Sequence, residues 1–245
     1  MKRKNKMKEV FVETCDSVKI GFNYYQTGHD DVIIICPGWF MTKDAKSFAD
    51  LAVYFSKFHD VVAMDFRGHG KSGGFYSFTS KEEFDIDAVV KFISDKYKNI
   101  YLVGFSLGAA LALLYGAKNS GIDKIIAVSA PAEFYKIENR MYLPEAWYPT
   151  LFKKFEPKRW LTVRPGNPFL HKDKPIDFVK NISVPTLFLA GKNDPTVFAW
   201  HTKNLYDAAN CDKNYICFEK GLHAEDLYID FPQKFTDICL NWLER

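Results

Sequence analysis

The sequence lacks the long apolar run that a membrane-spanning helix needs, and it lacks an excess of charge of either sign. Its 245 residues include 33 lysines and arginines against 30 aspartates and glutamates. A nucleic-acid-binding surface normally requires a basic stripe, and a helix needs about 20 apolar residues to cross a bilayer. We therefore expect neither a nucleic-acid partner nor stable insertion into a membrane.

Cysteine is scarce and scattered. The five cysteines are odd in number and show no C-x-x-C spacing, which argues against a disulfide framework and against a zinc site. Several of them stand in apolar runs, as buried free thiols do. This usage favours a reducing compartment, so the sequence predicts a cytoplasmic protein without a metal site.

Basic residues cluster only at residues 1–8. The cluster resembles the charged start of a signal peptide, but an alternating polar and apolar stretch follows it where a signal peptide would have an apolar core. We interpret residues 1–8 as a solvated basic N-terminal tail.

The sequence does contain enough apolar residues, 47%, for a large core. Strands are expected at 9–14, 18–26, 32–36, 61–66, 100–103, 124–130, 185–191 and 214–219, and helices at 44–57, 81–96, 109–115, 197–209 and 231–244. Continuously apolar strands are typical of a parallel sheet buried on both faces, and the first two strands fit an antiparallel edge hairpin. The alternation predicts an α/β fold with a doubly wound, mostly parallel sheet.

This alternation stops between residues 132 and 182, where the chain is irregular and rich in proline and aromatic residues. We predict a core of residues 9–131 and 183–245, with 132–182 inserted as a cap over the carboxyl edge of the sheet. The aromatic residues of the insertion either form its buried inner face or line an apolar pocket. Trp147 is our candidate for the pocket lining.

A serine stands at the apex of the strand-turn-helix stretch at 100–117. The turn reads Gly104-Phe105-Ser106-Leu107-Gly108, which is the spacing and context of a nucleophile elbow. A serine in a strained, positive-φ backbone needs neighbours without a Cβ, because strand and helix pass close together there. The pattern alone is weak, since a buried loop with a chance serine would look the same.

Further motifs follow the expected strands in a fixed order. They are Pro37-Gly38-Trp39-Phe40, Asp65-Phe66-Arg67-Gly68-His69-Gly70-Lys71-Ser72, Gly191-Lys192-Asn193-Asp194 and Gly221-Leu222-His223. Together with the serine turn they resemble the α/β-hydrolase family over nearly the whole chain, in the chain order Ser, Asp, His. The glycine-rich loop at 65–72 lacks the spacing of phosphate-binding loops, and we assign it no catalytic role.

The resemblance implies a catalytic triad of Ser106, His223 and Asp194. A serine hydroxyl needs an adjacent base to take its proton, and a carboxylate holds that base in the right tautomer. Glu133, after another strand, is an alternative acid. Asp194 could instead only cap the helix that follows it.

The other acidic residues and histidines are weaker candidates. Asp226 and Asp230 follow His223 on an expected helix, where we expect them to face solvent. The remaining histidines lie in a turn, before a strand, in the glycine-rich loop, in the insertion and in a helix: His29, His59, His69, His171 and His201.

The resemblance also implies an oxyanion hole made by the backbone N–H groups of Trp39 and Leu107. Leu107 begins a helix, whose dipole favours negative charge. Pro37 stands where the family usually has histidine, which changes the packing and hydrogen bonds of this loop but leaves its backbone donor. Trp39 and Phe40 either form an aromatic wall beside the substrate or pack in the core.

These residues favour a serine hydrolase that cleaves a small, partly apolar carboxylic ester through an acyl-enzyme, as a monomer or homodimer and without a metal or organic cofactor. The resemblance is to the branch of esterases, monoacylglycerol lipases and serine aminopeptidases with a small cap, so a thioesterase, a lipid hydrolase or an aminopeptidase is an alternative. Epoxide hydrolases and dehalogenases are disfavoured, because they carry aspartate in place of Ser106. A non-catalytic hydrolase fold that binds a small ligand is the second hypothesis.

Overall fold

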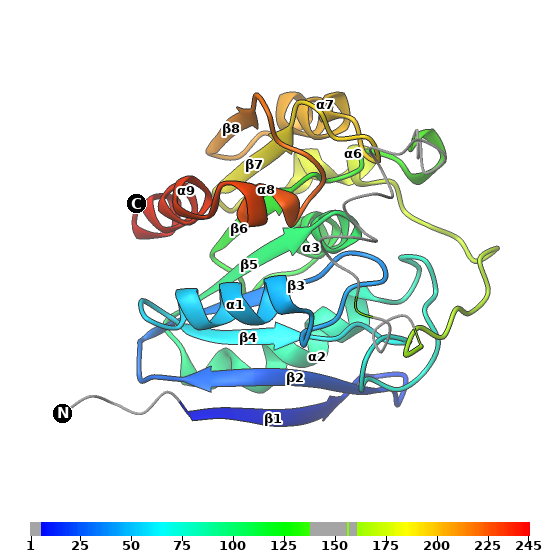
Figure 1. The fold of residues 1–245 in the computed structure, drawn as a ribbon. Coiled ribbons are helices and arrows are strands. Elements are labelled where there is room, and N and C mark those ends of the chain that lie inside the picture. The colour runs from blue at the N-terminus through cyan, green and yellow to red at the C-terminus, as the bar shows by residue number, and fades with distance from the viewer. Residues whose placement is uncertain (1–5, 138–155, 157–160) are drawn as a thin grey trace.

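Eight strands form one sheet in the order β1-β2-β4-β3-β5-β6-β7-β8 (Figure 1). The computed structural model describes residues 6–137, 156 and 161–245. The strands are β1 (Lys6–Glu13), β2 (Lys19–Gln26), β3 (Asp31–Cys36), β4 (Asp60–Met64), β5 (Asn99–Phe105), β6 (Lys124–Val128), β7 (Thr186–Gly191) and β8 (Lys213–Phe218). The pairs β1–β2 and β2–β4 are antiparallel, and every pair from β4 across to β8 is parallel.

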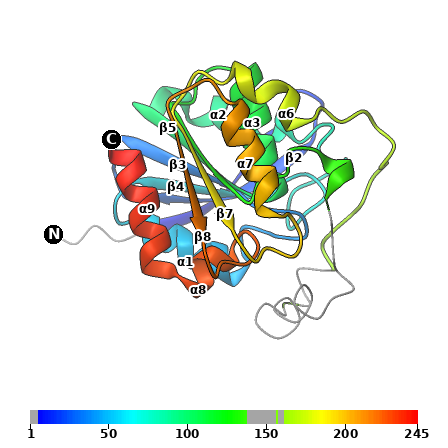
Figure 2. The ribbon, with the colours of Figure 1, turned by 90° about the horizontal axis from the view of Figure 1, so that it is seen from above.

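Helices cover both faces of this sheet. They are α1 (Lys46–Phe55), α2 (Glu83–Ile93), α3 (Leu107–Lys118), α6 (Pro175–Phe178), α7 (Ala199–Ala208), α8 (Asp226–Asp230) and α9 (Pro232–Glu244), with short 3₁₀ turns η1 (Ser94–Lys96), η2 (Phe134–Lys136) and η4 (Val179–Asn181). Seen from above, α1, α8 and α9 lie on one side of the sheet and α2, α3, α6 and α7 on the other (Figure 2). The predicted doubly wound, mostly parallel sheet is confirmed.

Each face of the sheet has its own apolar core. Successive side chains of a strand point to opposite faces, and in β3 Ile33 and Ile35 pack with α1 and α9 residues whereas Ile34 and Cys36 pack with α2 and α3 residues. The unbroken apolar run of β3 therefore reflects burial on both sides.

The N-terminal strand is longer than predicted. β1 begins at Lys6, and its ladder with β2 starts at the Lys6–Gln26 pair, so part of the expected tail at residues 1–8 belongs to the sheet. Main-chain pairing with β2 tolerates lysine here because β1 is an edge strand, and Lys8 is exposed.

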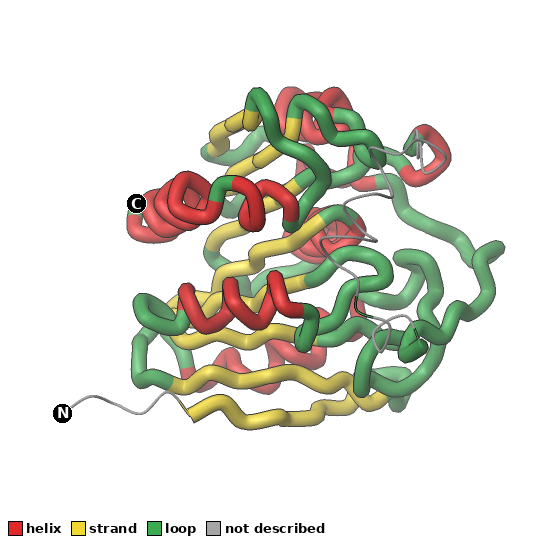
Figure 3. The backbone as a smooth tube through the Cα atoms, in the orientation of Figure 1, coloured by secondary structure: helices red, strands yellow, loops and turns green. Residues whose placement is uncertain are grey.

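The stretch expected as a cap is described at 132–137, 156 and 161–182. Its end joins the main core, because Val179 and Ile182 are buried among residues of the α3 face. The loop that leads from residue 161 to α6 runs outside the edge of the sheet to which β4 and β5 point (Figure 3). Trp147 lies outside the described residues, and its place in a pocket stays a prediction.

Candidate active site

Ser106 sits on a sharp turn between β5 and α3. Its backbone angles are φ 52° and ψ −118°, in the left-handed half of the map, and its N–H donates to the Val128 carbonyl at 2.8 Å. A Cβ on Gly108 would lie 2.2 Å from the Cys36 carbonyl oxygen and 2.3 Å from that of Pro37. The predicted positive-φ serine beside a residue that cannot carry a Cβ is confirmed.

His223 and Asp194 lie beside this serine in a continuous hydrogen-bonded line. Nε2 of His223 is 2.9 Å from Ser106 Oγ, and Nδ1 of His223 is 2.7 Å from Asp194 Oδ2. A carboxylate only accepts hydrogen bonds, so the proton belongs on Nδ1 and the lone pair on Nε2 faces the serine hydroxyl. The Asp194 side chain is fully buried and the His223 side chain is 19% exposed.

Asp194 also holds the turn that follows β7. Its Oδ1 accepts the N–H groups of Thr196 and Val197, both at 2.9 Å. The helix α7 starts at Ala199, with Phe198 at its N-cap, so Asp194 does not cap that helix. One carboxylate oxygen fixes the side chain to its own turn, and the other orients the imidazole.

Two residues outside the predicted triad, Ser129 and Gly191, hold the His223 loop in place. Ala224, next to His223, donates its N–H to Ser129 Oγ at 3.0 Å. Gly191 lets the loop come close, because a Cβ there would lie 2.1 Å from the Leu222 carbonyl oxygen. Gly191 was visible as part of a motif, but no local pattern marks Ser129, whose role depends on a partner 95 residues away.

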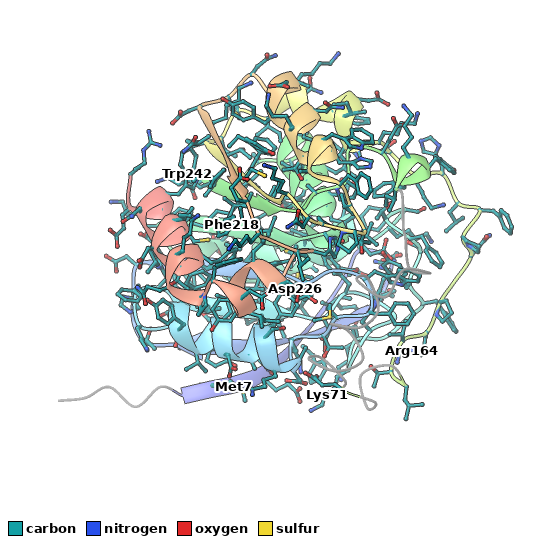
Figure 4. All side chains as sticks on the ribbon, turned by 45° about the horizontal axis from the view of Figure 1, so that its top comes forward. Met7, Lys71, Arg164, Phe218, Asp226 and Trp242 are labelled. Atoms are coloured by element: carbon teal, nitrogen blue, oxygen red, sulfur yellow. The ribbon has the colours of Figure 1, made fainter. Side chains whose placement is uncertain are left out.

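The alternative acids lie elsewhere. The Glu133 carboxylate pairs with Lys136 at 2.5 Å and with Lys174 at 3.4 Å. The expectation that Asp226 faces solvent is wrong, since Asp226 is 4% exposed (labelled in Figure 4). The reason is that the short α8 packs against both α1 and α9. Asp230 is exposed, as expected.

The other histidines have different partners. His69 bonds to Phe40 and Arg67, His201 to Ala132 and Lys136, and His171 to Asp173. His59 is buried against Tyr101, and His29 lies in the turn after β2.

The loop after β3 lies directly against Ser106. A Cβ on Gly38 would be 3.2 Å from the Ser106 Cβ, and Trp39 follows Gly38 as Leu107 follows Ser106. Within the ranges that the structure describes, the N–H groups of Trp39 and Leu107 donate to no protein acceptor. Two such unpaired donors beside a serine are what the predicted oxyanion hole requires.

The Trp39 ring packs against three other aromatic rings. Its ring centroid is 4.5 Å from that of Phe40, 5.9 Å from Phe78 and 6.4 Å from Tyr76, over which it stacks. Tyr76 is fully buried, whereas Trp39 is 42% exposed. Of the two alternatives for Trp39, packing in the core does not hold, because so exposed a side chain is not part of the core. Phe40 is half-buried.

Among the described residues, no group of three or more histidine, cysteine, aspartate or glutamate side chains could hold a metal ion. None of the helices in those ranges is both long and apolar enough to cross a bilayer.

A mostly parallel sheet of this order, with a serine on the turn from β5 to α3 and a histidine after the last strand, defines the α/β-hydrolase class. A family model described as alpha/beta hydrolase fold matches residues 31–159, and the chain belongs to this family. The chain is also similar to lysophospholipase L2 of Escherichia coli strain K12, with 26% identity over 130 residues. That match covers 47% of this chain and 37% of the relative, so the chain matches little more than a third of the relative's length.

Solved structures share the whole fold. An esterase from Pyrococcus furiosus superimposes with a TM-score of 0.80 at 24% identity, over 98% of this chain and 92% of its own. An esterase from Exiguobacterium antarcticum superimposes with a TM-score of 0.74 at 18% identity, over 97% of this chain and 100% of its own. A bromoperoxidase from Bacillus anthracis superimposes with a TM-score of 0.77 at 17% identity, over 97% of this chain and 100% of its own. At these identities the likeness shows the fold.

Proposed function

We propose that the protein is a serine hydrolase that cleaves small, partly apolar carboxylic esters. The observation that carries this proposal is the line of hydrogen bonds from Ser106 Oγ through His223 to Asp194, at 2.9 and 2.7 Å. The names of the relatives, a lysophospholipase and esterases, support the same chemistry.

The geometry suits acyl transfer in two steps. Ser106 Oγ attacks the carbonyl carbon of the ester while Nε2 of His223 takes the hydroxyl proton. The tetrahedral intermediate collapses, and the alcohol leaves with that proton. A water molecule then repeats the sequence on the acyl-enzyme, with His223 again as base. Asp194 accepts the hydrogen bond from Nδ1 and so holds the imidazole in the tautomer whose Nε2 can take the serine proton.

The charge that develops in the intermediate needs donors that are already in place. The N–H groups of Trp39 and Leu107, which both lie next to Ser106, would supply them. The Leu107 donor lies at the N-terminus of α3, where the helix dipole adds to the attraction. We assign the oxyanion hole to these two groups.

Labelling with a fluorophosphonate tests the proposal directly. We expect the folded protein to lose one serine proton and gain one phosphonyl group at Ser106, measured by intact mass and by peptide mapping. Two controls should stay unmodified. Ser106→Ala lacks the hydroxyl that reacts, and in the heat-denatured protein His223 no longer activates Ser106. A folded protein that remains unlabelled would favour the non-catalytic ligand-binding alternative, and labelling at another residue would mean that the nucleophile is not Ser106.

The exposed face of Trp39 is the wall against which we place the apolar part of the substrate. We expect Trp39→Ala to lower kcat/KM about tenfold on octanoate esters and less than threefold on acetate esters, since a lost aromatic contact with a longer chain is worth on the order of 1 kcal/mol. The measurement is a series of p-nitrophenyl esters of increasing acyl length, with a thioester and an aminoacyl amide added to decide between bond types.

Phe58→Ala is the control for that series, because Phe58 is 44% exposed and lies in the turn after α1, beside the Tyr54 ring. It should leave all rates unchanged. If Trp39→Ala changes every ester by the same factor, Trp39 does not contact the acyl chain.

A further inference from the structure

The loop after β3, residues 37–43, is held by the glycine-rich loop after β4. The N–H of Phe40 donates to Nε2 of His69 at 3.3 Å, and the N–H of Lys43 donates to Asp65 Oδ1 at 2.7 Å. Pro37, at the start of this loop, has neither an N–H nor a polar side chain to fix it. The loop that carries the Trp39 donor therefore depends on contacts from residues 65–72.

The His69 contact acts on the peptide unit next to that donor. Phe40 has a φ of 60°, a conformation that a bulky residue keeps only when its surroundings hold it. Its N–H belongs to the peptide plane that joins Trp39 to Phe40. Fixing this plane limits the rotation of Trp39, and so fixes the direction of the Trp39 N–H.

His69 is built to accept this hydrogen bond. Its Nδ1 lies 3.1 Å from the Arg67 carbonyl oxygen, which can only accept, so Nδ1 carries the proton and Nε2 is left as the acceptor. The ring is 1% exposed. Burial first, and the charge of Arg164 besides, lower the pKa of His69 to about 4, which keeps the imidazole neutral.

The glycine-rich loop is itself held by Arg164, which lies within the stretch 132–182 expected as a cap and is labelled in Figure 4. The Arg164 side chain donates to the carbonyl oxygens of Ser72 and Gly74. Its N–H donates to the Gly68 carbonyl at 2.7 Å, and its carbonyl accepts from Tyr76 at 2.8 Å. The Tyr76 ring packs edge-on against His69 at 4.8 Å. The His69 imidazole is therefore held by the Arg67 carbonyl of its own loop and by the ring of Tyr76.

We propose that His69 is a positioning residue for the reaction: through its bond to the Phe40 N–H it aims the Trp39 N–H at the oxyanion. The inference rests on the proposed ester hydrolysis. It gives the glycine-rich loop a role that does not require contact with the substrate.

Two matched substitutions separate the acceptor from the rest of the side chain. His69→Gln places an amide oxygen where Nε2 accepts from Phe40, whereas His69→Asn places an amide N–H near Nδ1 and leaves the Phe40 N–H without its acceptor. We expect His69→Asn to lower kcat for p-nitrophenyl butyrate about 10- to 100-fold with KM changed less than threefold, because only the transition state uses the donor. His69→Gln should retain kcat within about fivefold.

A trifluoromethyl ketone inhibitor provides the readout that a merely structural role would not move. It forms a hemiketal oxyanion on Ser106, so its Ki should rise in His69→Asn by the same factor by which kcat/KM falls, while the inhibition constant of the product butyrate stays unchanged. Circular dichroism and thermal unfolding show whether each variant is folded. Should His69→Asn fail to fold, His69→Phe, which keeps an aromatic ring at this position but offers the Phe40 N–H no acceptor, is compared with His69→Gln in its place.

Equal losses in both single variants, or a fall in kcat without a matching rise in Ki, would overturn the role of His69. A wild-type protein that is not labelled at Ser106 and hydrolyses no ester would overturn the proposed function and this inference together. Labelling at Ser106 with unchanged kinetics in His69→Asn would overturn the inference alone.

Discussion

Replacing Ser106 with alanine is expected to lower kcat for ester hydrolysis by at least about 10⁴-fold. The hydroxyl is the only group in the hydrogen-bonded line that can form the acyl bond, and His223 Nε2 at 2.9 Å is placed to take its proton. The residual rate comes from the backbone donors and from binding. The measurement is kcat on a p-nitrophenyl ester, corrected for spontaneous hydrolysis.

The same experiment on the partners tests whether the three residues act as one unit. We expect His223→Ala to cost about as much as Ser106→Ala, and Asp194→Asn about 10³- to 10⁴-fold, because the amide would favour the wrong tautomer of His223. The double variant Ser106→Ala, His223→Ala should be no slower than Ser106→Ala alone.

His59→Gln is the matched control for loss of a buried imidazole. His59 is 6% exposed and its ring packs against Tyr101, and we have given it no part in the reaction. Its kcat should stay within twofold of wild type. Near-wild-type hydrolysis by all three triad variants would mean that the catalytic residues lie elsewhere.

Signals that depend on neighbours in the sequence predicted most of this structure. The apolar runs predicted the interior strands, because a strand that is buried on both faces is apolar at successive positions, whereas an edge strand carries polar residues as well. The turn at Ser106 could be predicted with its positive φ, since strand, serine and helix are consecutive. The residues brought beside it, Asp194 and His223, were found through motif order.

Apart from the triad, contacts between distant segments were not predicted. Ser129 holds the His223 loop from 95 residues away, and His69 reaches Phe40 across 29 residues. Each depends on how two loops meet at the edge of the sheet. The prediction that Asp226 faces solvent was wrong for a related reason, because its helix α8 is too short for a periodic pattern to show which side is buried. Lys6 shows the opposite case. The basic composition predicted a solvated tail there, but the residue pairs with β2 as the first residue of β1.

A close approach of two backbone segments at Gly108 links the stability of the fold to the oxyanion hole. We expect Gly108→Ala to lower the free energy of unfolding by about 3 kcal/mol. The new Cβ would lie 2.2 Å from the Cys36 carbonyl oxygen and 2.3 Å from the Pro37 carbonyl oxygen. Both atoms are backbone, so either α3 or the loop after β3 must move.

That movement should also lower kcat, because the two proposed oxyanion donors lie on the two segments that the new Cβ forces apart. Displacing one donor typically costs 10²- to 10³-fold, and we expect a loss of at least about tenfold in Gly108→Ala. Urea unfolding and kcat on p-nitrophenyl butyrate, measured on the same preparation, give the two quantities.

Gly116→Ala is the control in the same helix. Gly116 is buried in α3, but a Cβ there meets Cδ1 of Ile125 at 2.5 Å and Cδ1 of Ile122 at 3.3 Å, the movable ends of two side chains. The gain in helix propensity, about 1 kcal/mol, offsets the repacking of these side chains, so stability and kcat should stay near wild type. If Gly108→Ala behaved like Gly116→Ala, the close packing of α3 on the end of β3 would not be what sets the oxyanion geometry.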